Sequence, residues 1–233
     1  MNTPTALVFL IDDDASVRKG VSRLVLSAGY KCETFASATH FLAREPNGGP
    51  TCLIVDVRMP GLNGMELQEV LLERRREEQL VFITGHGDIS MCSQAMKAGA
   101  VDFLPKPFGD DQLLECVARA LSRSSEQRQR SVEKSEARRL LDSLTPREFE
   151  VMQLVVAGML NKQIAAELAI AEKTVKVHRG RVMQKLGVTS VAELVRLGQR
   201  AGIGSAALVR PRSDIRRGRQ LANWCCVKDR LLG

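Results

Sequence analysis

The fold of the first half of the chain is decided by the stretch Ala6-Leu7-Val8-Phe9-Leu10-Ile11-Asp12-Asp13-Asp14. It is a short apolar run closed by carboxylates, which is typical of a buried strand. A similar run over residues 51–55 ends at Asp56, and another over residues 101–104 leads to Lys106. Segments long enough for crossover helices separate the runs, and parallel strands joined in this way end at one edge of their sheet. We therefore predict that several carboxylates and one ammonium group meet at that edge.

Such a group of carboxylates is suited to a divalent cation. Carboxylates within several ångströms of each other repel by on the order of a few kcal/mol per pair at a moderate dielectric constant. Mg²⁺ relieves this repulsion and prefers one or two carboxylates together with phosphate oxygens and waters. An aspartate is ionised at neutral pH, so it can attack phosphorus without a general base when cations neutralise the phosphoryl charge. The pattern predicts a site that accepts a phosphoryl group.

Three further segments of the first half carry a family resemblance. They are Ile83-Thr84-Gly85-His86-Gly87-Asp88, the run from Ala95 to Phe103, and Lys106-Pro107-Phe108. Together with the acidic run and Asp56, they closely resemble the receiver domain of the two-component response regulators in order and spacing. Five strands and five helices alternate through this half, which predicts an α/β fold, a doubly wound (βα)5 sheet. The resemblance also implies a cis peptide between Lys106 and Pro107.

The receiver resemblance implies a role for each polar residue at the sheet edge. Asp56 would be the phosphoacceptor, and a sensor histidine kinase would supply the phosphoryl group. The Mg²⁺ site would be formed by Asp13, Asp56 and the main-chain carbonyl of Arg58, and Asp12 would contribute through water. Thr84 and Lys106 would bind the phosphoryl oxygens, and Phe103 would be the aromatic switch. A receiver is not an enzyme and would at most dephosphorylate itself.

The same residues allow other interpretations. A run of three aspartates after a strand is also typical of a helix start, and we assign Asp14 as the N-cap of the next helix. A nucleophilic aspartate in an α/β sheet also fits a phosphoaspartyl enzyme. Enzymes that resemble the haloacid dehalogenases need a second acid two residues after the nucleophile, where this chain has Arg58. His86 lies between glycines without a second His or Cys nearby, so we expect a surface loop residue.

The charge of the chain differs between its two halves. Residues 1–121 carry 12 basic and 16 acidic side chains, whereas residues 144–202 carry 9 and 5, and the whole chain has a net charge of +7. We therefore predict two domains, and any nucleic acid that binds would bind to the second. Residues 122–143 have almost no apolar periodicity, which predicts a polar, partly helical linker. The six cysteines show no metal-ligand spacing, and we find neither a membrane-spanning run nor a signal peptide, so we expect a cytoplasmic chain with reduced thiols.

The second domain is predicted to be helical from its caps. Thr145 as N-cap, Pro146 at the first helical position and Glu148 three residues beyond the cap form a capping box. Residues 161–168 and 172–186 predict two helices joined by a short break, and the second has a basic face, as in a helix-turn-helix. A fourth helix is expected to begin at Ser190, where Glu193 repeats the capping box, and to end at Gly202.

These segments closely resemble the LuxR-type four-helix DNA-binding domain, in the FixJ-like branch of the NarL/LuxR response regulators. Val175, Val182 and Leu186 form an inward stripe, which leaves Lys173, Thr174, Lys176, His178 and Arg179 for DNA. Val177 on the same helix and Lys162 on the preceding helix complete the predicted DNA-binding residues. We assign Lys176 and Val177 to base edges, and Lys162 and Arg179 to phosphates. Gly180 departs from branches of the family that have lysine at this position, which puts one contact in doubt.

The two resemblances together imply a transcriptional response regulator. Phosphorylation of Asp56 would promote homodimerisation and the binding of residues 144–202 to promoter DNA, and RNA polymerase is a further candidate partner. A receiver with an RNA-binding or protein-binding output is the alternative, and the helix-turn-helix pattern argues against it. Residues 203–233 fall outside the resemblance and carry seven basic and two acidic side chains. We predict a disordered extension there, with an electrostatic DNA-binding arm as the alternative.

Overall fold

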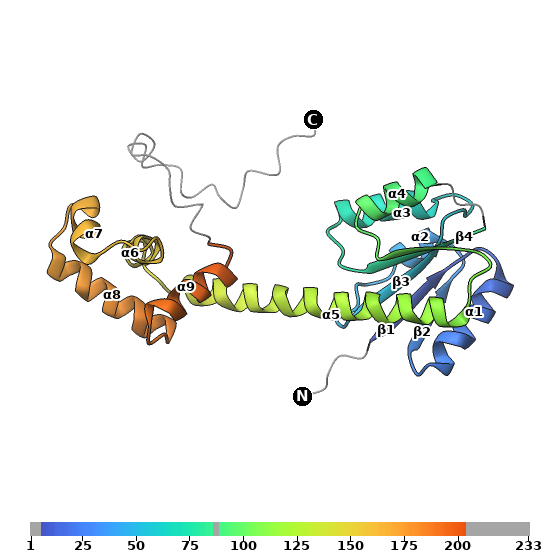
Figure 1. Cartoon of the computed structure of the whole chain (residues 1–233), viewed down its shortest axis with the longest axis horizontal. Helices are drawn as coiled ribbons and strands as arrows, with labels where there is room; N and C mark the ends of the chain where they lie inside the picture. Colours follow the sequence, from blue (N-terminus) through green and yellow to red (C-terminus); the bar gives the residue numbers. More distant parts are fainter. Residues whose placement is uncertain (1–5, 86–88, 204–233) are drawn as a thin grey trace. The chain divides into compact units, whose positions relative to one another are not determined.

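The computed structural model describes residues 6–85 and 89–203 (Figure 1). The chain divides into two compact units, and the boundary along the sequence lies between Ser131 and Val132. The first unit alternates strands with helices, and the second is helical. The predictions for His86, for Cys225 and Cys226, and for the extension from residue 204 onward lie outside the described residues. Within the described residues, no helix combines the length and the apolar composition that a bilayer crossing needs.

A parallel sheet forms the centre of the first unit, as the strand pattern predicted. Its order is β2-β1-β3-β4-β5, formed by β1 (Leu7–Ile11), β2 (Lys31–Phe35), β3 (Thr51–Asp56), β4 (Gln79–Thr84) and β5 (Asp102–Pro105). The order reverses between β1 and β3, which makes their carboxyl ends the topological switch point. Ile11 pairs with Val55, so Asp12 and Asp56 leave the two strands at the same level.

Helices cover both faces of the sheet, which confirms the doubly wound arrangement. They are α1 (Ala15–Ser27), α2 (Ala38–Leu42), α3 (Gly64–Glu73), α4 (Ile89–Lys97) and α5 (Asp110–Leu141). Alternate residues of β1 enter two separate cores, Phe9 with α2 and α3, and Leu10 with α1 and α5. Both side chains are fully buried, and burial of each contributes roughly 1.5–3 kcal/mol. A sheet buried on both faces explains the continuous apolar runs in the sequence.

Helix α1 fixes the loop that carries the acidic residues. The Asp14 side chain accepts hydrogen bonds from the backbone N–H groups of Ser16 (2.7 Å) and Val17 (3.4 Å), which confirms its assignment as the N-cap. Gly29 follows the helix with a φ of 84°, a conformation that side chains with a Cβ rarely adopt. The loop from Asp12 to Asp14 is therefore held between the end of β1 and a capped helix.

Helix α5 is longer than the sequence predicted. We expected it to end at Leu121 before a partly helical linker, but it continues as one helix of 32 residues to Leu141. Arg, Gln, Glu and Lys, which are abundant in the polar segment, are good helix formers even without an apolar stripe. Residues of this polar segment also make buried contacts. Ser124 is buried, and its hydroxyl accepts a hydrogen bond from the Thr51 N–H (2.9 Å). Ala137 packs in the core of the second unit.

The second unit has the predicted helices around one core. They are α6 (Pro146–Val156), α7 (Asn161–Leu168), α8 (Glu172–Leu186) and α9 (Val191–Arg200), and the last turns of α5 pack with them. The capping box at Thr145 is confirmed, because Glu148 accepts from the Thr145 N–H (2.9 Å) and Thr145 accepts from the Glu148 N–H (3.3 Å).

The second predicted capping box forms only in part. The Ser190 hydroxyl accepts from the Glu193 N–H (3.2 Å), as predicted for an N-cap. The Glu193 carboxylate, however, accepts from the N–H (2.7 Å) and the hydroxyl (3.0 Å) of Thr189. Thr189 offers two donors where the cap residue would offer one, so the carboxylate reaches one residue further back.

Candidate functional site

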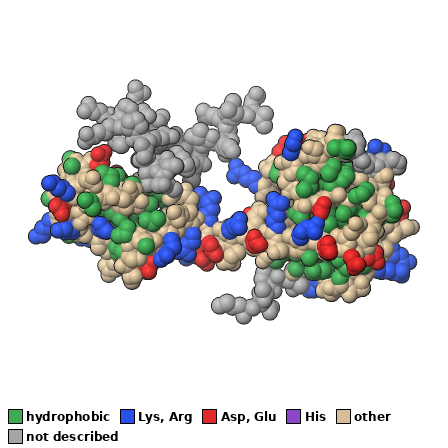
Figure 2. Space-filling model, viewed as in Figure 1, with side chains coloured by type: hydrophobic (Ala, Val, Ile, Leu, Met, Phe, Trp, Pro, Cys, Tyr) green, Lys and Arg blue, Asp and Glu red, His purple; other side chains and the backbone are tan. Residues whose placement is uncertain are grey.

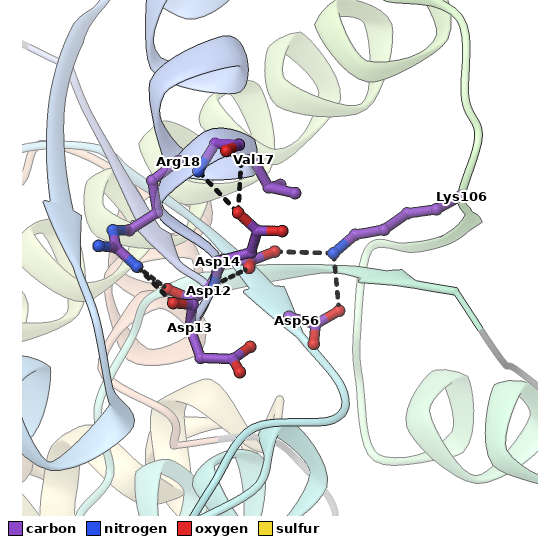
Figure 3. A network of polar contacts seen from close by, with 8 residues as sticks. Asp12, Asp13, Asp14, Val17, Arg18, Asp56 and Lys106 are labelled. Atoms are coloured by element: carbon purple, nitrogen blue, oxygen red, sulfur yellow. Dashed lines mark hydrogen bonds and ion pairs between the residues drawn. The ribbon is translucent and has the colours of Figure 1, made fainter.

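The ends of three strands meet at one polar site in the first unit. Lys106 Nζ lies 2.7 Å from Asp12 Oδ2 and 3.0 Å from Asp56 Oδ1 (Figure 3). Asp12 is fully buried and Asp56 is 6% exposed, so these carboxylates are largely removed from water. The structure therefore brings together three residues that the strand pattern placed at one edge.

The loop after β1 is fixed by a residue that the sequence did not indicate. Arg18 Nη1 donates to the main-chain carbonyl oxygens of both Asp12 (2.7 Å) and Asp13 (2.9 Å), as Figure 3 shows. The Asp14 N–H donates to Asp12 Oδ1 (2.8 Å), so both oxygens of the Asp12 carboxylate are engaged. The Asp13 side chain is exposed beside this buried group. Arg18 lies one turn into α1, a position where arginine is ordinarily only solvated.

The site carries more negative than positive charge, and this shapes its ionisation. Burial raises the pKa of Asp56, the Lys106 ammonium works against this rise, and the charges of Asp12 and Asp13 add to it. The pKa of Asp56 is therefore above its ordinary value. Burial alone would lower the pKa of Lys106, but its hydrogen bonds to Asp12 and Asp56 outweigh this, so the pKa of Lys106 is raised. The ammonium group is consequently held in its charged form.

The remaining predicted residues lie around this centre. Thr84 ends β4, is buried, and its carbonyl oxygen accepts from the Lys106 N–H (2.6 Å). Phe103 on β5 is half-buried, with its ring centroid 6.1 Å from that of Phe82. Arg58 is exposed two residues beyond Asp56. The Lys106–Pro107 peptide is cis, as the resemblance implied.

Gly64 is a second residue that sequence reasoning missed. It is the first residue of α3, and a Cβ there would lie 2.6 Å from the Asp56 carbonyl oxygen. Real Cβ atoms do not approach so closely, so any side chain would displace either the helix or the strand end that carries Asp56. The sequence shows only that a glycine follows the N-cap residue Asn63. The close approach of α3 to β3, which the structure shows, explains why this residue is a glycine.

The donor set suits a magnesium ion bound through few side chains. Among the described residues, no three His, Cys, Asp or Glu side chains gather as a metal-binding group. Mg²⁺ does not need three, because it keeps several waters and is usually bound by one or two carboxylates. Lys106 occupies one oxygen of Asp56, and the exposed carboxylate of Asp13 lies on the neighbouring strand end. These hard oxygen donors fit the ion.

The predicted DNA-binding residues lie on α7 and α8. Val175, Val182 and Leu186 are buried, which confirms the inward stripe. Five of the seven predicted residues are exposed, namely Lys162, Lys173, Thr174, Lys176 and Val177. His178 and Arg179 are half-buried at the edge of this face. Figure 2 shows Lys and Arg side chains at several places on the visible face of the helical unit.

Polar groups on α8 also turn toward the protein. Arg179 Nη1 donates to Asn161 Oδ1 (3.0 Å), and His178 Nδ1 is buried without a hydrogen-bond partner among the described residues. Lys185 Nζ donates to the Glu148 carboxylate (2.7 Å), which is almost fully buried. Lys185, together with the Thr145 N–H, lowers the pKa of Glu148 to about 2. This pair could not be predicted from residue spacing, because its members lie on different helices.

Two family models match the chain, one on each unit. The response regulator receiver domain matches residues 8–118, and the luxR family of bacterial regulatory proteins matches residues 142–197. Among curated relatives, nodulation protein W of Bradyrhizobium diazoefficiens is 43% identical over 200 residues, covering 86% of this chain and 88% of that protein. Transcriptional regulatory protein FixJ of the same organism is 39% identical, covering 84% and 96%.

A solved structure of similar extent gives the same result. The response regulator StyR, determined at low resolution, is 48% identical and superposes with a TM-score of 0.73, covering 84% of this chain and 99% of that one. Transcriptional response regulators, the family to which these matches point, interact with sensor kinases and promoter DNA and are not catalytic enzymes. The chain therefore belongs to the transcriptional response regulators of two-component systems, with a receiver domain followed by a LuxR-type DNA-binding domain.

Proposed function

We propose that a sensor histidine kinase phosphorylates this regulator on Asp56 and that the phosphorylated form dimerises and binds promoter DNA. The observation that carries the proposal is the place of Asp56 at the end of β3, where it is 6% exposed and 3.0 Å from the ammonium group of Lys106. Ligands of doubly wound sheets bind at such strand ends. A carboxylate beside a fixed cation, next to a buried second carboxylate, is suited to receive a phosphoryl group.

The reaction would transfer a phosphoryl group from the imidazole of the kinase histidine to the carboxylate of Asp56. One Oδ of Asp56 attacks the phosphorus of the kinase phosphohistidine and forms a P–O bond. The P–N bond breaks, its electron pair returns to the imidazole nitrogen, and that nitrogen takes up a proton. Lys106 would neutralise the charge of the phosphoryl oxygens, and the Thr84 hydroxyl would donate to one of them.

Magnesium would be bound by Asp13, Asp56 and the main-chain carbonyl of Arg58. When bound, the ion supplies positive charge to the phosphoryl oxygens and offsets the excess of carboxylates. Asp12 supports the site indirectly: both of its oxygens are engaged, so a contact through water, as the resemblance implied, fits better than direct ligation. Arg18 holds the carbonyls of the two adjacent aspartates, which keeps their loop in one conformation.

The switch would pass from Thr84 to Phe103. When the Thr84 hydroxyl turns to a phosphoryl oxygen, it leaves space into which the half-buried ring of Phe103 rotates. The surface around α4 and β5 then changes shape and pairs with a second copy. Two DNA-binding domains brought together in this way read two half-sites about one helical turn apart.

DNA contact is assigned to the exposed residues of α7 and α8. Lys176 and Val177 lie early on α8 and are exposed, which suits contact with base edges. Lys162, Lys173 and Thr174 are exposed as well and suit the phosphate backbone. The regulator would act in the cytoplasm, where promoter DNA and RNA polymerase are found, and would turn over nothing beyond its own phosphoaspartate. We place the domain limits at residues 121 and 144; the family matches cover residues 8–118 and 142–197.

Phosphorylation of Asp56 is tested with a small radiolabelled phosphodonor and Mg²⁺. The full-length protein should take up label, and Asp56→Asn or chelation of the metal should abolish it. Asp14→Asn is the matched control, because Asp14 is a neighbouring carboxylate that caps α1 and has no assigned role in the transfer. Label that persists in Asp56→Asn would place the acceptor elsewhere.

Coupling through Thr84 is tested separately. Thr84→Val keeps the shape of the side chain and removes the hydroxyl. The variant should retain part of the phosphate uptake, yet light scattering after phosphorylation should show a monomer where the wild-type protein forms a dimer. Normal dimerisation of the variant would show that the hydroxyl is not the coupling element.

A further inference from the structure

Three polar contacts join helices α6, α7 and α8 in pairs. Arg147 of α6 donates to the Leu168 carbonyl at the end of α7 (2.8 Å). Arg179 of α8 donates to Asn161 at the start of α7 (3.0 Å), and Lys185 of α8 donates to Glu148 of α6 (2.7 Å). Each pair of helices in the helix-turn-helix therefore shares one contact to a charged side chain. These three contacts are called the polar braces below.

The polar braces hold the helices at their ends. Asn161 and Leu168 are the first and last residues of α7, so this helix is held at both termini from two different neighbours. The Leu168 carbonyl is one of the groups that an α-helix leaves without an internal partner, and Arg147 satisfies it. Lys185 lies in the last turn of α8, and Glu148 lies in the first turn of α6. Hydrogen bonds that involve charged groups are shorter and stronger than neutral ones.

The apolar packing of these two helices is centred on a few buried residues. Within α7 only Ile164 is buried, with Ala165 and Leu168 partly buried beside it, and α8 buries Val175, Val182 and Leu186. Contacts to base edges need groups that are held within about 10–20° of their productive orientation. The polar braces add restraints at the helix ends to this central apolar packing.

We propose that Arg179 and Lys185 are positioning residues for DNA recognition, and that they act by fixing the orientation of α8 instead of touching DNA. This inference rests on the proposed DNA contacts of α8 and replaces the phosphate role that the sequence predicted for Arg179. The guanidinium of Arg179 faces Asn161 from the edge of the exposed surface, and the ammonium of Lys185 faces a carboxylate that is almost fully buried. Neither cation is arranged as a free surface charge.

The salt dependence of binding separates a positioning residue from a phosphate contact. Each phosphate contact releases counterions on binding. Log affinity therefore falls with log salt concentration, and losing one contact makes this negative slope shallower by about one unit. A positioning residue changes how well the remaining contacts are made, so its loss lowers affinity for a preferred sequence and leaves the slope unchanged. Both effects are measured in one titration series.

The probe is a labelled duplex that the full-length, phosphodonor-treated wild-type protein recovers from a random library. Arg179→Met keeps the apolar part of the side chain and removes its donor. We expect about a ten-fold loss of affinity with an unchanged salt slope. Asn161→Ala should give a similar loss, and the double variant should bind no more weakly than either single variant, because both remove one contact. Lys162→Met is the comparison and should lower the slope by about one unit.

Lys185 is tested by the same titration with a conservative rescue. Lys185→Met should lose affinity at an unchanged slope, and Lys185→Arg should recover most of it because the donor is kept. Far-UV circular dichroism of each variant shows whether the helices are retained. A slope lowered by about one unit in Arg179→Met, or additive losses in the double variant with Asn161, would overturn the proposal for Arg179. An unchanged affinity in Lys185→Met would overturn it for Lys185.

Failure of the DNA-contact assignment has a different signature. If Lys162→Met leaves the slope unchanged while Arg179→Met behaves as expected, then the phosphate contact of Lys162 is wrong and the polar braces stand.

Discussion

Two lysines of this molecule make nearly the same contact in different charge environments. Lys106 Nζ lies 2.7 Å from Asp12 in the receiver domain, and Lys185 Nζ lies 2.7 Å from Glu148 in the DNA-binding domain. Both carboxylates are buried, with side-chain exposures of 0% and 4%. Lys106 also faces Asp56, with Asp13 beside it, whereas Lys185 faces one carboxylate. The first site has excess negative charge and the second is balanced.

The ionisation of the two sites follows this difference. The pKa of Asp56 is raised, first by burial and further by its acidic neighbours, while the pKa of Glu148 is lowered to about 2, first by Lys185. At a helix terminus, an ion pair with balanced charge needs no further counter-ion and stabilises the fold. In an unbalanced site the carboxylates repel one another, and a bound cation can relieve this repulsion. Groups with shifted pKa values of this kind cluster at functional sites.

The largest effect is expected from Lys106→Met without added metal. The substitution leaves Asp12 and Asp56 facing each other with no cation, and removal of one partner from a buried ion pair is strongly destabilising. Because the Lys106 side chain is 24% exposed, we expect a loss of about 2 kcal/mol in the free energy of unfolding of the receiver domain. Millimolar Mg²⁺ should restore much of this loss. Hydrogen exchange of the sheet amides measures both effects.

Lys185→Met is the matched comparison for that experiment. It should destabilise α6 and α8, and Mg²⁺ should not restore the loss, since the substitution leaves only the single, almost fully buried carboxylate of Glu148 and no second carboxylate beside it. Equal rescue of both variants by Mg²⁺ would contradict the distinction between an unbalanced and a balanced site.

The next effect is expected in acid and concerns Glu148. Its folded-state pKa of about 2 lies below its ordinary value, so its carboxylate contributes stability that is fully present above about pH 4.5 and is lost as the pH falls toward 2. Glu148→Gln should therefore be less stable than the wild-type protein at neutral pH. The gap between their free energies of unfolding should narrow as the pH falls from about 4.5 toward 2. Hydrogen exchange of α6 measured at several pH values follows the gap. A difference that stays constant between about pH 4.5 and 2 would contradict this role of the Glu148 carboxylate.

A smaller effect of opposite sign is expected from Asp13→Asn. Removing one of the crowded negative charges should stabilise the metal-free receiver domain by on the order of 1 kcal/mol. The same change should weaken Mg²⁺ binding in a calorimetric titration, because a proposed ligand is lost. Destabilisation of the metal-free protein would show that the site is not strained by its charge.

The smallest effect is expected from Glu172→Gln. Lys176 and Glu172 are 3.6 Å apart with side chains 65% and 49% exposed, so this pair is largely screened by water. Surface pairs of this kind contribute roughly 0–1 kcal/mol, and we expect a change below about 0.5 kcal/mol in the stability of the DNA-binding domain. A loss as large as that of Lys185→Met would show that burial does not distinguish the two lysine contacts.

The sequence predicted the receiver site better than its surroundings, for a physical reason. Asp12, Asp56 and Lys106 follow apolar runs, and parallel topology brings strand ends together whatever the helices do. Arg18 and Gly64 could not be recognised, since their roles depend on the rotation of α1 and on the close approach of α3 to β3. Neither quantity is encoded in the spacing of residues along one element.

Helix surfaces were predicted less completely for the same reason. Periodicity placed Val175 and Val182 inside and Lys176 outside, as the structure confirms. Arg179 lies at the edge between the two faces, where a long side chain can turn toward either DNA or Asn161, and only the packing of α7 determines which. Helix propensity could have extended α5 beyond Leu121, but an absent apolar stripe outweighed it in our prediction.

The hydrogen bond between Ser124 and Thr51 bears on how receivers can be exchanged between regulators. The receiver family match ends at residue 118, yet the Thr51 N–H is buried and has its acceptor on a residue beyond that limit. A chimera joined at residue 118 to a foreign output domain with no hydroxyl at the equivalent position would leave this donor unsatisfied, at a cost of about 1–3 kcal/mol. Modular grafts of this receiver should therefore place their junction after Ser124, so that the transplanted piece includes the first turns of what looks, in sequence, like a linker.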